Sequence, residues 1–322
     1  MTHVVLATDK VSESGLDSLA KDDRFDVVFA HDSEAEAFSE LLTGASGLIV
    51  RSATQVDAEL MEKAPELKVI GRAGVGVDNI DIPAASARGI AVVNAPSGNT
   101  IAAAELTVAL MLAAMRHIAA ADASLRAGNW DRASFKGWEL NGKRLGLIGA
   151  GRIGAEVAIR CMSFGMEVII YDPYLPDSRA TEIGSRLTDL EEVITTSDVV
   201  SCHVPLNDET RGIVDAEALD RMKEEAIVIN ASRGGVVNED DLAAALVSGT
   251  IRGAALDVYE DEPLSEGSPL RSAPNLTLTP HLGASTAEAQ VHVAVEVARN
   301  VASVLADGDL STALNRAELV DG

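Results

Sequence analysis

The sequence has 322 residues, of which 47% are hydrophobic but only 3% aromatic, and it carries a formal net charge of −24. This apolar content excludes a disordered chain, and the length suits two domains whose cores are built from Ala, Val, Leu and Ile. The negative charge argues against a nucleic-acid partner, and the two cysteines, Cys161 and Cys202, are typical of a reducing compartment and not of a disulfide framework.

The first nine residues, MTHVVLATD, are typical of a strand and its turn and not of a secretory signal, so we expect a cytoplasmic protein. The most apolar stretch, 101–121, contains Glu105, Arg116 and His117. We interpret it as a buried helix of a soluble domain, with no membrane partner. The acidity itself has two explanations: an ordinary acidic cytosolic enzyme, or adaptation to high internal salt.

Short apolar runs alternate with helical segments in the first third of the chain, a pattern typical of βαβ units and a parallel sheet. The predicted strands are residues 4–7, 27–30, 47–50, 69–73 and 91–94. The predicted helices between them are 12–20, 33–43 and 57–64, each of which begins at a polar residue.

A long alanine-rich helix is predicted next, over 101–128, and a second βαβ series follows it. Its predicted strands are 144–148, 167–171, 199–203, 226–230, 253–257 and 276–279, and a last helix covers 285–306. The first series lacks a helix on one side of its sheet, and the last helix can return to supply it. We therefore predict an α/β fold of two doubly wound parallel-sheet domains, in which a Rossmann domain, 99–285, is inserted into a flavodoxin-like domain, 1–98 with 286–322.

The first motif with chemical meaning is GAGRIG at 149–154, between a predicted strand and a predicted helix. Gly149 permits a tight turn, Gly151 lets the backbone approach a pyrophosphate, and Gly154 lets the helix pack closely on the strand. The helix N-terminus offers free N–H groups to the phosphates. Asp172 ends the next strand, where an acid accepts hydrogen bonds from the adenosine ribose and repels a 2′-phosphate. The motif therefore predicts NAD in preference to NADP.

The second motif is NASRGG at 230–235, at the end of another predicted strand. Ligands of open parallel sheets bind beyond the carboxyl ends of the strands. Arg233 is therefore a candidate to hold a substrate carboxylate with its planar guanidinium. A surface ion pair with Glu239 or Asp240 is the equally weighted alternative.

Two further segments follow strands, LDVYEDEP at 256–263 and PHLGA at 280–284. Hydride transfer at a hydroxyl carbon needs a partner for the hydroxyl proton, and histidine suits that task near neutral pH. His281 is the candidate, and His203, which also ends a strand, is its rival. A carboxylate hydrogen-bonded to the histidine would fix its tautomer, and the spacing leaves three acids open: Glu260, Asp261 and Glu262.

Asp257 has two interpretations of similar weight, a position at the nicotinamide end of the cofactor or a role in capping a turn. No metal site is predicted, because Cys161 and Cys202 do not form a Cys-x-x-Cys pattern and no helix carries a His-x-x-x-His pair.

Taken together, these motifs resemble those of the D-isomer-specific 2-hydroxyacid dehydrogenases and, among them, the D-3-phosphoglycerate dehydrogenases. The resemblance extends over essentially the whole chain. Besides the glycine turn and NASRGG, it rests on VRSAT at 50–54, GRAGVGVDNID at 71–81, NAP at 94–96, AAE at 103–105, ALDVY at 255–259, DEP at 261–263 and TPHLGAST at 279–286.

The resemblance implies a catalytic trio of Arg233, Glu262 and His281, which selects one of the three acids and sets His203 aside. The residues that it implies at the cofactor site are Gly149, Gly151, Arg152, Ile153, Gly154, Asp172, Val204, Ala231, Asp257, His281 and Gly283. Those implied at the substrate are Arg51, Arg72, Val75, Gly76, Asn99, Arg132, Arg233 and His281. Arg51, Arg72 and Arg132 would meet a substrate phosphate, with surface ion pairs as their alternative role.

The implied reaction is NAD-dependent oxidation of 3-phospho-D-glycerate to 3-phosphohydroxypyruvate, the first step of serine biosynthesis, with two domains that close over a small anionic substrate. Two alternatives stay open: a dehydrogenase of another D-2-hydroxyacid (hydroxypyruvate, glyoxylate, lactate or a sulfonated acid), or an NADH-sensing corepressor-like binding protein. The long helix and the family both favour a homodimer or homotetramer. Many phosphoglycerate dehydrogenases carry a further serine-binding region. This sequence is either a short form or a truncated chain, and inhibition by serine through such a region is not expected.

Overall fold

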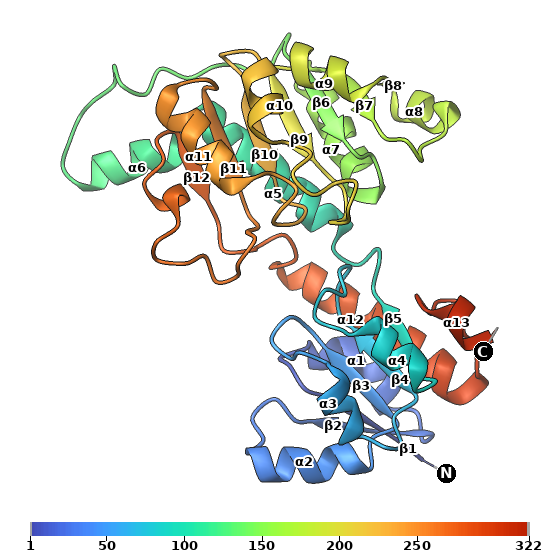
Figure 1. The fold of residues 1–322 in the computed structure, drawn as a ribbon. Helices are drawn as coiled ribbons and strands as arrows, with labels where there is room; N and C mark the ends of the chain where they lie inside the picture. The colour runs from blue at the N-terminus through green and yellow to red at the C-terminus, as the bar shows by residue number, and fades with distance from the viewer. Residues whose placement is uncertain (1, 321–322) are drawn as a thin grey trace. The chain divides into compact units, whose positions relative to one another are not determined.

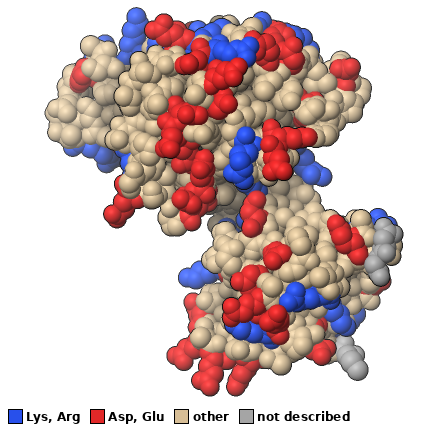
Figure 2. Space-filling model, viewed as in Figure 1, with Lys and Arg blue, Asp and Glu red and all other residues tan. Residues whose placement is uncertain are grey.

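The computed structural model describes residues 2–320, which divide by their contacts into two compact units. Unit 1 contains the residues up to 99 together with those from 284 onward, and unit 2 contains residues 100–283. Each unit is built around one parallel sheet with helices on both faces (Figure 1). The chain has 50 Asp and Glu against 26 Lys and Arg, and acidic side chains are spread over both units on the face shown in Figure 2.

Unit 1 contains a five-stranded sheet in the order β2-β1-β3-β4-β5, which is the flavodoxin-like order. Its strands are β1 (His3–Ala7), β2 (Phe25–Phe29), β3 (Gly47–Val50), β4 (Val69–Arg72) and β5 (Ala91–Asn94). Its helices are α1 (Glu13–Ala20), α2 (Ala35–Thr43), α3 (Ala58–Glu62), α4 (Ile82–Ala87), α12 (Ala287–Ala302) and α13 (Arg316–Val320).

The last long helix returns to the first sheet, as the sequence predicted. Val293, Val297 and Val301 of α12 pack in one buried cluster with side chains of β1, β3 and β4, because they recur at helical spacing on one face. Thr286 caps the N-terminus of α12 by accepting a hydrogen bond from the Ala289 N–H at 3.1 Å. This helix and α1 cover one face of the sheet, and α2, α3 and α4 cover the other.

Unit 2 contains a seven-stranded sheet in the order β12-β11-β10-β9-β6-β7-β8. Counted within the unit, this is the 3-2-1-4-5-6 order of dinucleotide-binding domains, extended by one strand. The strands are β6 (Arg144–Ile148), β7 (Glu167–Tyr171), β8 (Arg186–Leu187), β9 (Val199–Cys202), β10 (Ile227–Asn230), β11 (Gly253–Leu256) and β12 (Leu276–Leu278). The helices are α5 (Thr100–Met115), α6 (Ile118–Arg126), α7 (Arg152–Ser163), α8 (Asp177–Ile183), α9 (Leu190–Thr196), α10 (Ala216–Arg221) and α11 (Glu239–Ser248).

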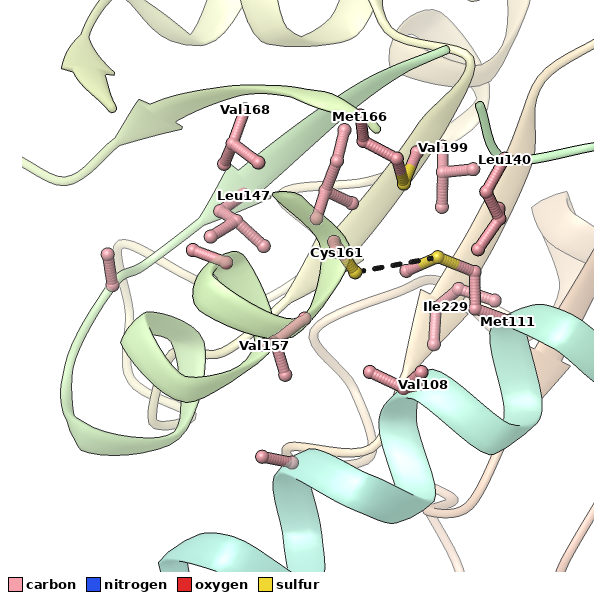
Figure 3. Close-up of a cluster of buried hydrophobic side chains, with 14 of the residues drawn as sticks. Val108, Met111, Leu140, Leu147, Val157, Cys161, Met166, Val168, Val199 and Ile229 are labelled. Atoms are coloured by element: carbon pink, nitrogen blue, oxygen red, sulfur yellow. Dashed lines mark hydrogen bonds between the residues drawn. The ribbon is translucent and has the colours of Figure 1, made fainter. Parts of the chain in front are cut away.

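Helices α5 and α7 cover one face of this sheet, and their contact is centred on two sulfur atoms. Cys161 of α7 points at Met111 of α5, with 3.9 Å between Sγ and Sδ, inside a shell of aliphatic side chains (Figure 3). Burial raises the pKa of the Cys161 thiol to about 12, and Cys202 is also buried and free. Both cysteines are therefore neutral thiols that fill the core.

The prediction of one continuous helix over 101–128 is wrong. The segment forms α5 and α6, which meet at 63°, and His117 between them has a left-handed backbone with φ of +53°. The His117 ring packs edge-on against Trp138, with 6.1 Å between the ring centroids. Helix α5 buries one side in the unit core, whereas α6 buries no residue.

Within residues 2–320 no single helix is long and apolar enough to cross a membrane, although α5 and α6 together meet the length and composition criteria as a bent pair.

Candidate active site

The glycine turn lies between β6 and α7, and each of its three glycines has a distinct reason to be glycine. Gly149 has φ of +89°, and a Cβ there would lie 2.6 Å from the carbonyl oxygen of His203. A Cβ on Gly154 would lie 2.6 Å from the carbonyl oxygen of Gly149. A Cβ on Gly151 would meet nothing within 4 Å, so the space beside this residue is open. No side chain caps α7, and its first N–H groups and this open space suit a pyrophosphate.

Asp172 follows β7 directly and holds the glycine turn in place. Its Oδ2 accepts a hydrogen bond from the Ala150 N–H at 3.0 Å, and its Oδ1 accepts one from the Tyr174 N–H at 3.0 Å. Each carboxylate oxygen has a second acceptor site, so these contacts leave capacity for ribose hydroxyls. Val204 also borders the turn, with its Cγ1 2.7 Å from the place of a Gly149 Cβ. The donor turn, the acid and the open space together fit NAD.

The loop that carries Arg233 is shaped by Asn230, the last residue of β10. The Asn230 Nδ2 donates to the Arg233 carbonyl at 2.8 Å, and its Oδ1 accepts from the Ser232 N–H at 3.0 Å and from the Ser232 hydroxyl at 2.8 Å. A Cβ on Gly234 would lie 1.8 Å from the Tyr259 carbonyl oxygen, so only glycine lets this loop approach the one after β11. These contacts hold the arginine at the carboxyl end of the sheet.

His281 and Glu262 form a direct pair. The Glu262 Oε2 lies 2.7 Å from the His281 Nδ1, and the Glu262 Oε1 accepts a hydrogen bond from the Tyr259 N–H at 3.2 Å. Burial raises the pKa of Glu262, but the hydrogen bond and charge of His281, together with the Tyr259 N–H and the Arg233 charge, outweigh it, so the net pKa lies below its usual value. The His281 side chain is 44% exposed.

Asp257 secures the loop that presents His281. Its carboxylate is fully buried and accepts hydrogen bonds from the Thr279 hydroxyl at 2.6 Å, the Leu282 N–H at 2.8 Å and the Gly283 N–H at 2.9 Å. His281 itself has φ of +54°, a left-handed conformation that only a fixed loop maintains. The capping interpretation of Asp257 is therefore confirmed, and its contact with the cofactor stays a prediction.

The rival histidine, His203, occupies a different environment. Its Nε2 lies 2.9 Å from the Ser201 hydroxyl, and burial lowers the pKa of the imidazole to about 4. A histidine with so low a pKa is neutral at pH 7 and is a weak proton acceptor. Its backbone carbonyl lies against the glycine turn, so we interpret His203 as a structural residue beneath the cofactor site.

The predicted substrate residues of unit 1 gather at the carboxyl ends of the paired strands β3 and β4. Arg51 follows β3, and the guanidinium of Arg72, the last residue of β4, lies over Gly74, where a Cβ would be 1.6 Å from its Nη1. The Asn94 Nδ2 donates to the Val75 carbonyl at 2.6 Å and so fixes the segment that continues into Gly76. Asn99 is the last residue of unit 1 before the chain enters unit 2, and in unit 2 Arg132 is exposed between α6 and β6.

Three residues that hold the site together received no role from the sequence, although they stand in the quoted motifs. They are Asn230, Tyr259 and Thr279, each at the carboxyl end of a strand or in the loop that follows one. The Tyr259 hydroxyl donates to the Thr279 carbonyl at 2.8 Å, and burial raises its pKa to about 12. A search for polar side chains at strand ends would have found all three.

Comparisons with known proteins agree with this geometry. Residues 108–283 match the family model for the NAD-binding domain of the D-isomer-specific 2-hydroxyacid dehydrogenases. A D-3-phosphoglycerate dehydrogenase from Archaeoglobus fulgidus is 45% identical over 311 residues, which are 97% of this chain and 59% of that protein. The chain therefore spans less than two thirds of the length of this relative.

Solved structures agree as well. The TT0316 protein of Thermus thermophilus has a TM-score of 0.84 and 36% identity, over 97% of this chain and 99% of that one. A glyoxylate reductase from Paecilomyes thermophila has a TM-score of 0.85 and 30% identity, over 97% of this chain and 98% of that one.

Proposed function

The chain belongs to the D-isomer-specific 2-hydroxyacid dehydrogenases, and we propose that it oxidises 3-phospho-D-glycerate to 3-phosphohydroxypyruvate with NAD, the first step of serine biosynthesis. The observation that carries the proposal is the 2.7 Å contact between Glu262 and His281 at the carboxyl end of a sheet that also presents a dinucleotide turn. The likeness to a phosphoglycerate dehydrogenase supports the choice of acid.

The glycine turn and the residues around it would hold the cofactor. The pyrophosphate would lie beside Gly151 at the N-terminus of α7, with Asp172 at the adenosine ribose. The other proposed cofactor residues are Arg152, Ile153, Val204, Ala231, Asp257 and Gly283. Bound NAD supplies the acceptor for the hydride that leaves the substrate.

The protein's own residues handle the proton and the substrate charge. His281 takes the hydroxyl proton on its Nε2, because its Nδ1 is engaged by Glu262. The Glu262 carboxylate fixes the ring orientation and stabilises the imidazolium that forms. Arg233 binds the substrate carboxylate and, in the reverse reaction, polarises the carbonyl group.

The substrate contacts of unit 1 complete the proposal. We assign the substrate carboxylate to the backbone of residues 75–76 as well as to Arg233, and we place Asn99 near the substrate. We assign the phosphate to Arg51, Arg72 and Arg132, because guanidinium groups in a protein of net charge −24 suit an anionic ligand. The domains would have boundaries at 98/99 and 285/286, and we propose a cytoplasmic homodimer or homotetramer.

A second candidate is reduction of an unphosphorylated 2-ketoacid, which the likeness to a glyoxylate reductase favours. The experiment that separates the two is a steady-state screen of phosphorylated and unphosphorylated 2-hydroxy and 2-keto acids with NAD(H) and NADP(H). We expect the highest kcat/KM for 3-phosphohydroxypyruvate with NADH. Turnover of glyoxylate or hydroxypyruvate alone would refute the phosphorylated substrate. Ordinary turnover would also exclude a protein that only senses NADH.

A further inference from the structure

The loop 51–54, which follows β3 and carries Arg51, is held at both ends by two side chains from elsewhere in unit 1. One is Asp9, which follows β1 and is 7% exposed. The other is Asn79, which lies between β4 and α4. Between these two ends, Ser52 and Ala53 are exposed.

Asp9 accepts hydrogen bonds from the loop. Its Oδ2 accepts from the Arg51 N–H at 2.6 Å and from the Thr54 N–H at 3.3 Å, and its Oδ1 accepts from the Thr54 hydroxyl at 2.5 Å. The Thr54 hydroxyl also lies 2.9 Å from the hydroxyl of Thr8. The N–H groups at positions 51 and 54 are thus both directed inward, at one carboxylate.

Asn79 bonds the carbonyl groups of the same two residues. Its Nδ2 donates to the Arg51 carbonyl at 2.7 Å and to the Thr54 carbonyl at 2.6 Å, which uses both of its amide hydrogens. All four backbone polar groups of Arg51 and Thr54 are therefore satisfied by Asp9 and Asn79. The loop is fixed without any contact to its exposed tip.

The Arg51 side chain is fixed as well. Its Nη1 donates to the Lys10 carbonyl at 3.2 Å, so the guanidinium lies beside the segment that follows Asp9. A guanidinium has five N–H donors, and this contact uses one of them. A phosphate at the tip would meet this guanidinium and the exposed Ser52.

We propose that Asp9 and Asn79 are positioning residues for recognition of the substrate's anionic group by loop 51–54. The inference rests on the proposed function, because it assumes that Arg51 meets the substrate phosphate. An anion is bound tightly only by groups that are held at fixed positions. Loosening the loop should therefore weaken binding of the phosphate and leave the positions of the hydride-transfer residues in unit 2 unchanged.

The test compares 3-phosphohydroxypyruvate with hydroxypyruvate, which lacks the phosphate, in the wild type and in Asn79→Ala. Loss of two hydrogen bonds should raise the KM for the phosphorylated acid about tenfold. The KM for hydroxypyruvate, the kcat for both acids and the Kd for NADH should change less than about twofold.

Three further variants separate the positioning role from a mere loss of stability. Thr54→Val, which removes the hydroxyl bonded to Asp9, should raise the same KM, and Thr54→Ser should restore it. The matched control is Asn315→Ala, because Asn315 is also a buried amide of unit 1 that bonds backbone groups, those of Ile90 and Val92. It should lower the melting temperature without changing the ratio of the two KM values.

The outcomes separate the two proposals. A wild type without preference for the phosphorylated acid would overturn the proposed function and this inference with it. A wild type with that preference, combined with Asn79→Ala and Thr54→Val variants that raise both KM values equally or neither, would overturn the positioning role alone. A rise confined to the phosphorylated acid, with rescue by serine at position 54, supports it.

Discussion

The Glu262 Oε2 lies 2.7 Å from the His281 Nδ1, and the two residues come from the loops that follow the paired strands β11 and β12. Because Nδ1 contacts Glu262, Nε2 is the ring nitrogen left for the substrate proton. The buried carboxylate of Asp257 holds the loop around His281, because it accepts hydrogen bonds from the Thr279 hydroxyl and from the Leu282 and Gly283 N–H groups.

Glu262→Gln should lower kcat about ten- to a hundredfold, because a neutral amide neither fixes the ring nor stabilises the imidazolium as well as a carboxylate. Binding of NADH should be unchanged. The matched control is Glu260→Gln, an exposed acid two residues earlier in the same loop, which should retain kcat. Equal kcat values in the two variants would contradict the role of Glu262.

The same pair predicts a dependence of stability on pH. The pKa of Glu262 is lowered in the folded protein, so its stabilising contribution is fully present above pH 4.5 and is lost as the pH falls through the lowered pKa. The difference in the free energy of unfolding between wild type and Glu262→Gln should therefore shrink below about pH 4.5. Urea unfolding of both proteins at pH 5 and pH 3 measures it, and a difference that is larger at pH 3 than at pH 5 would contradict the lowered pKa.

Substitution of glycine by alanine should have different effects at two positions of the glycine turn. Gly149→Ala should lower the melting temperature, because its backbone has φ of +89° and its Cβ would lie 2.6 Å from the His203 carbonyl oxygen. Gly151→Ala should leave the melting temperature nearly unchanged, because nothing lies within 4 Å, but should weaken NADH binding. Thermal unfolding and NADH fluorescence titration test both. A stable Gly149→Ala, or full NADH binding by Gly151→Ala, would contradict these roles.

His203 should make the protein less stable in mild acid. Its pKa is lowered from 6.5 to about 4, so the unfolded chain binds a proton below pH 6.5 that the folded protein excludes. Between pH 7 and pH 5 this group should cost about 1 to 2 kcal/mol of unfolding free energy. Over the same pH interval, the unfolding free energy of His203→Gln should fall by about 1 to 2 kcal/mol less than that of the wild type, as measured by urea unfolding. An equal loss in both proteins would contradict the lowered pKa of His203.

Much of the fold was predictable because its signals are local. Strands such as β3 and β5 are short apolar runs bounded by polar segments, and their predicted ends agree with the structure. The return of α12 was predicted from an uncovered sheet face. The glycine turn was predictable in the same way, since a strand, three glycines and a helix stand in a fixed order.

The remaining features depend on contacts between residues far apart in the sequence. The break at His117 was missed because the apolar, alanine-rich pattern continues through it. In the structure His117 takes a left-handed backbone, and the Trp138 N–H bonds the carbonyl of Met115, the last residue of α5. The helices α4, α8, α9, α10, α11 and α13 and the strand β8 were not among the predicted elements. Glu262 was chosen among three neighbouring acids from the family resemblance. Which of the three reaches His281 depends on the geometry of the loop, and the spacing of residues in the sequence does not determine that geometry.

The most direct test of the central claim is the turnover of His281→Ala together with its affinity for NADH. We predict that kcat for 3-phosphohydroxypyruvate falls by about two to four decades, while the Kd for NADH stays close to the wild-type value. His292→Ala, an exposed histidine on α12, is the control and should retain full turnover. Turnover by His281→Ala within a few-fold of the wild type would contradict the assignment of His281 as the acid and base of the reaction.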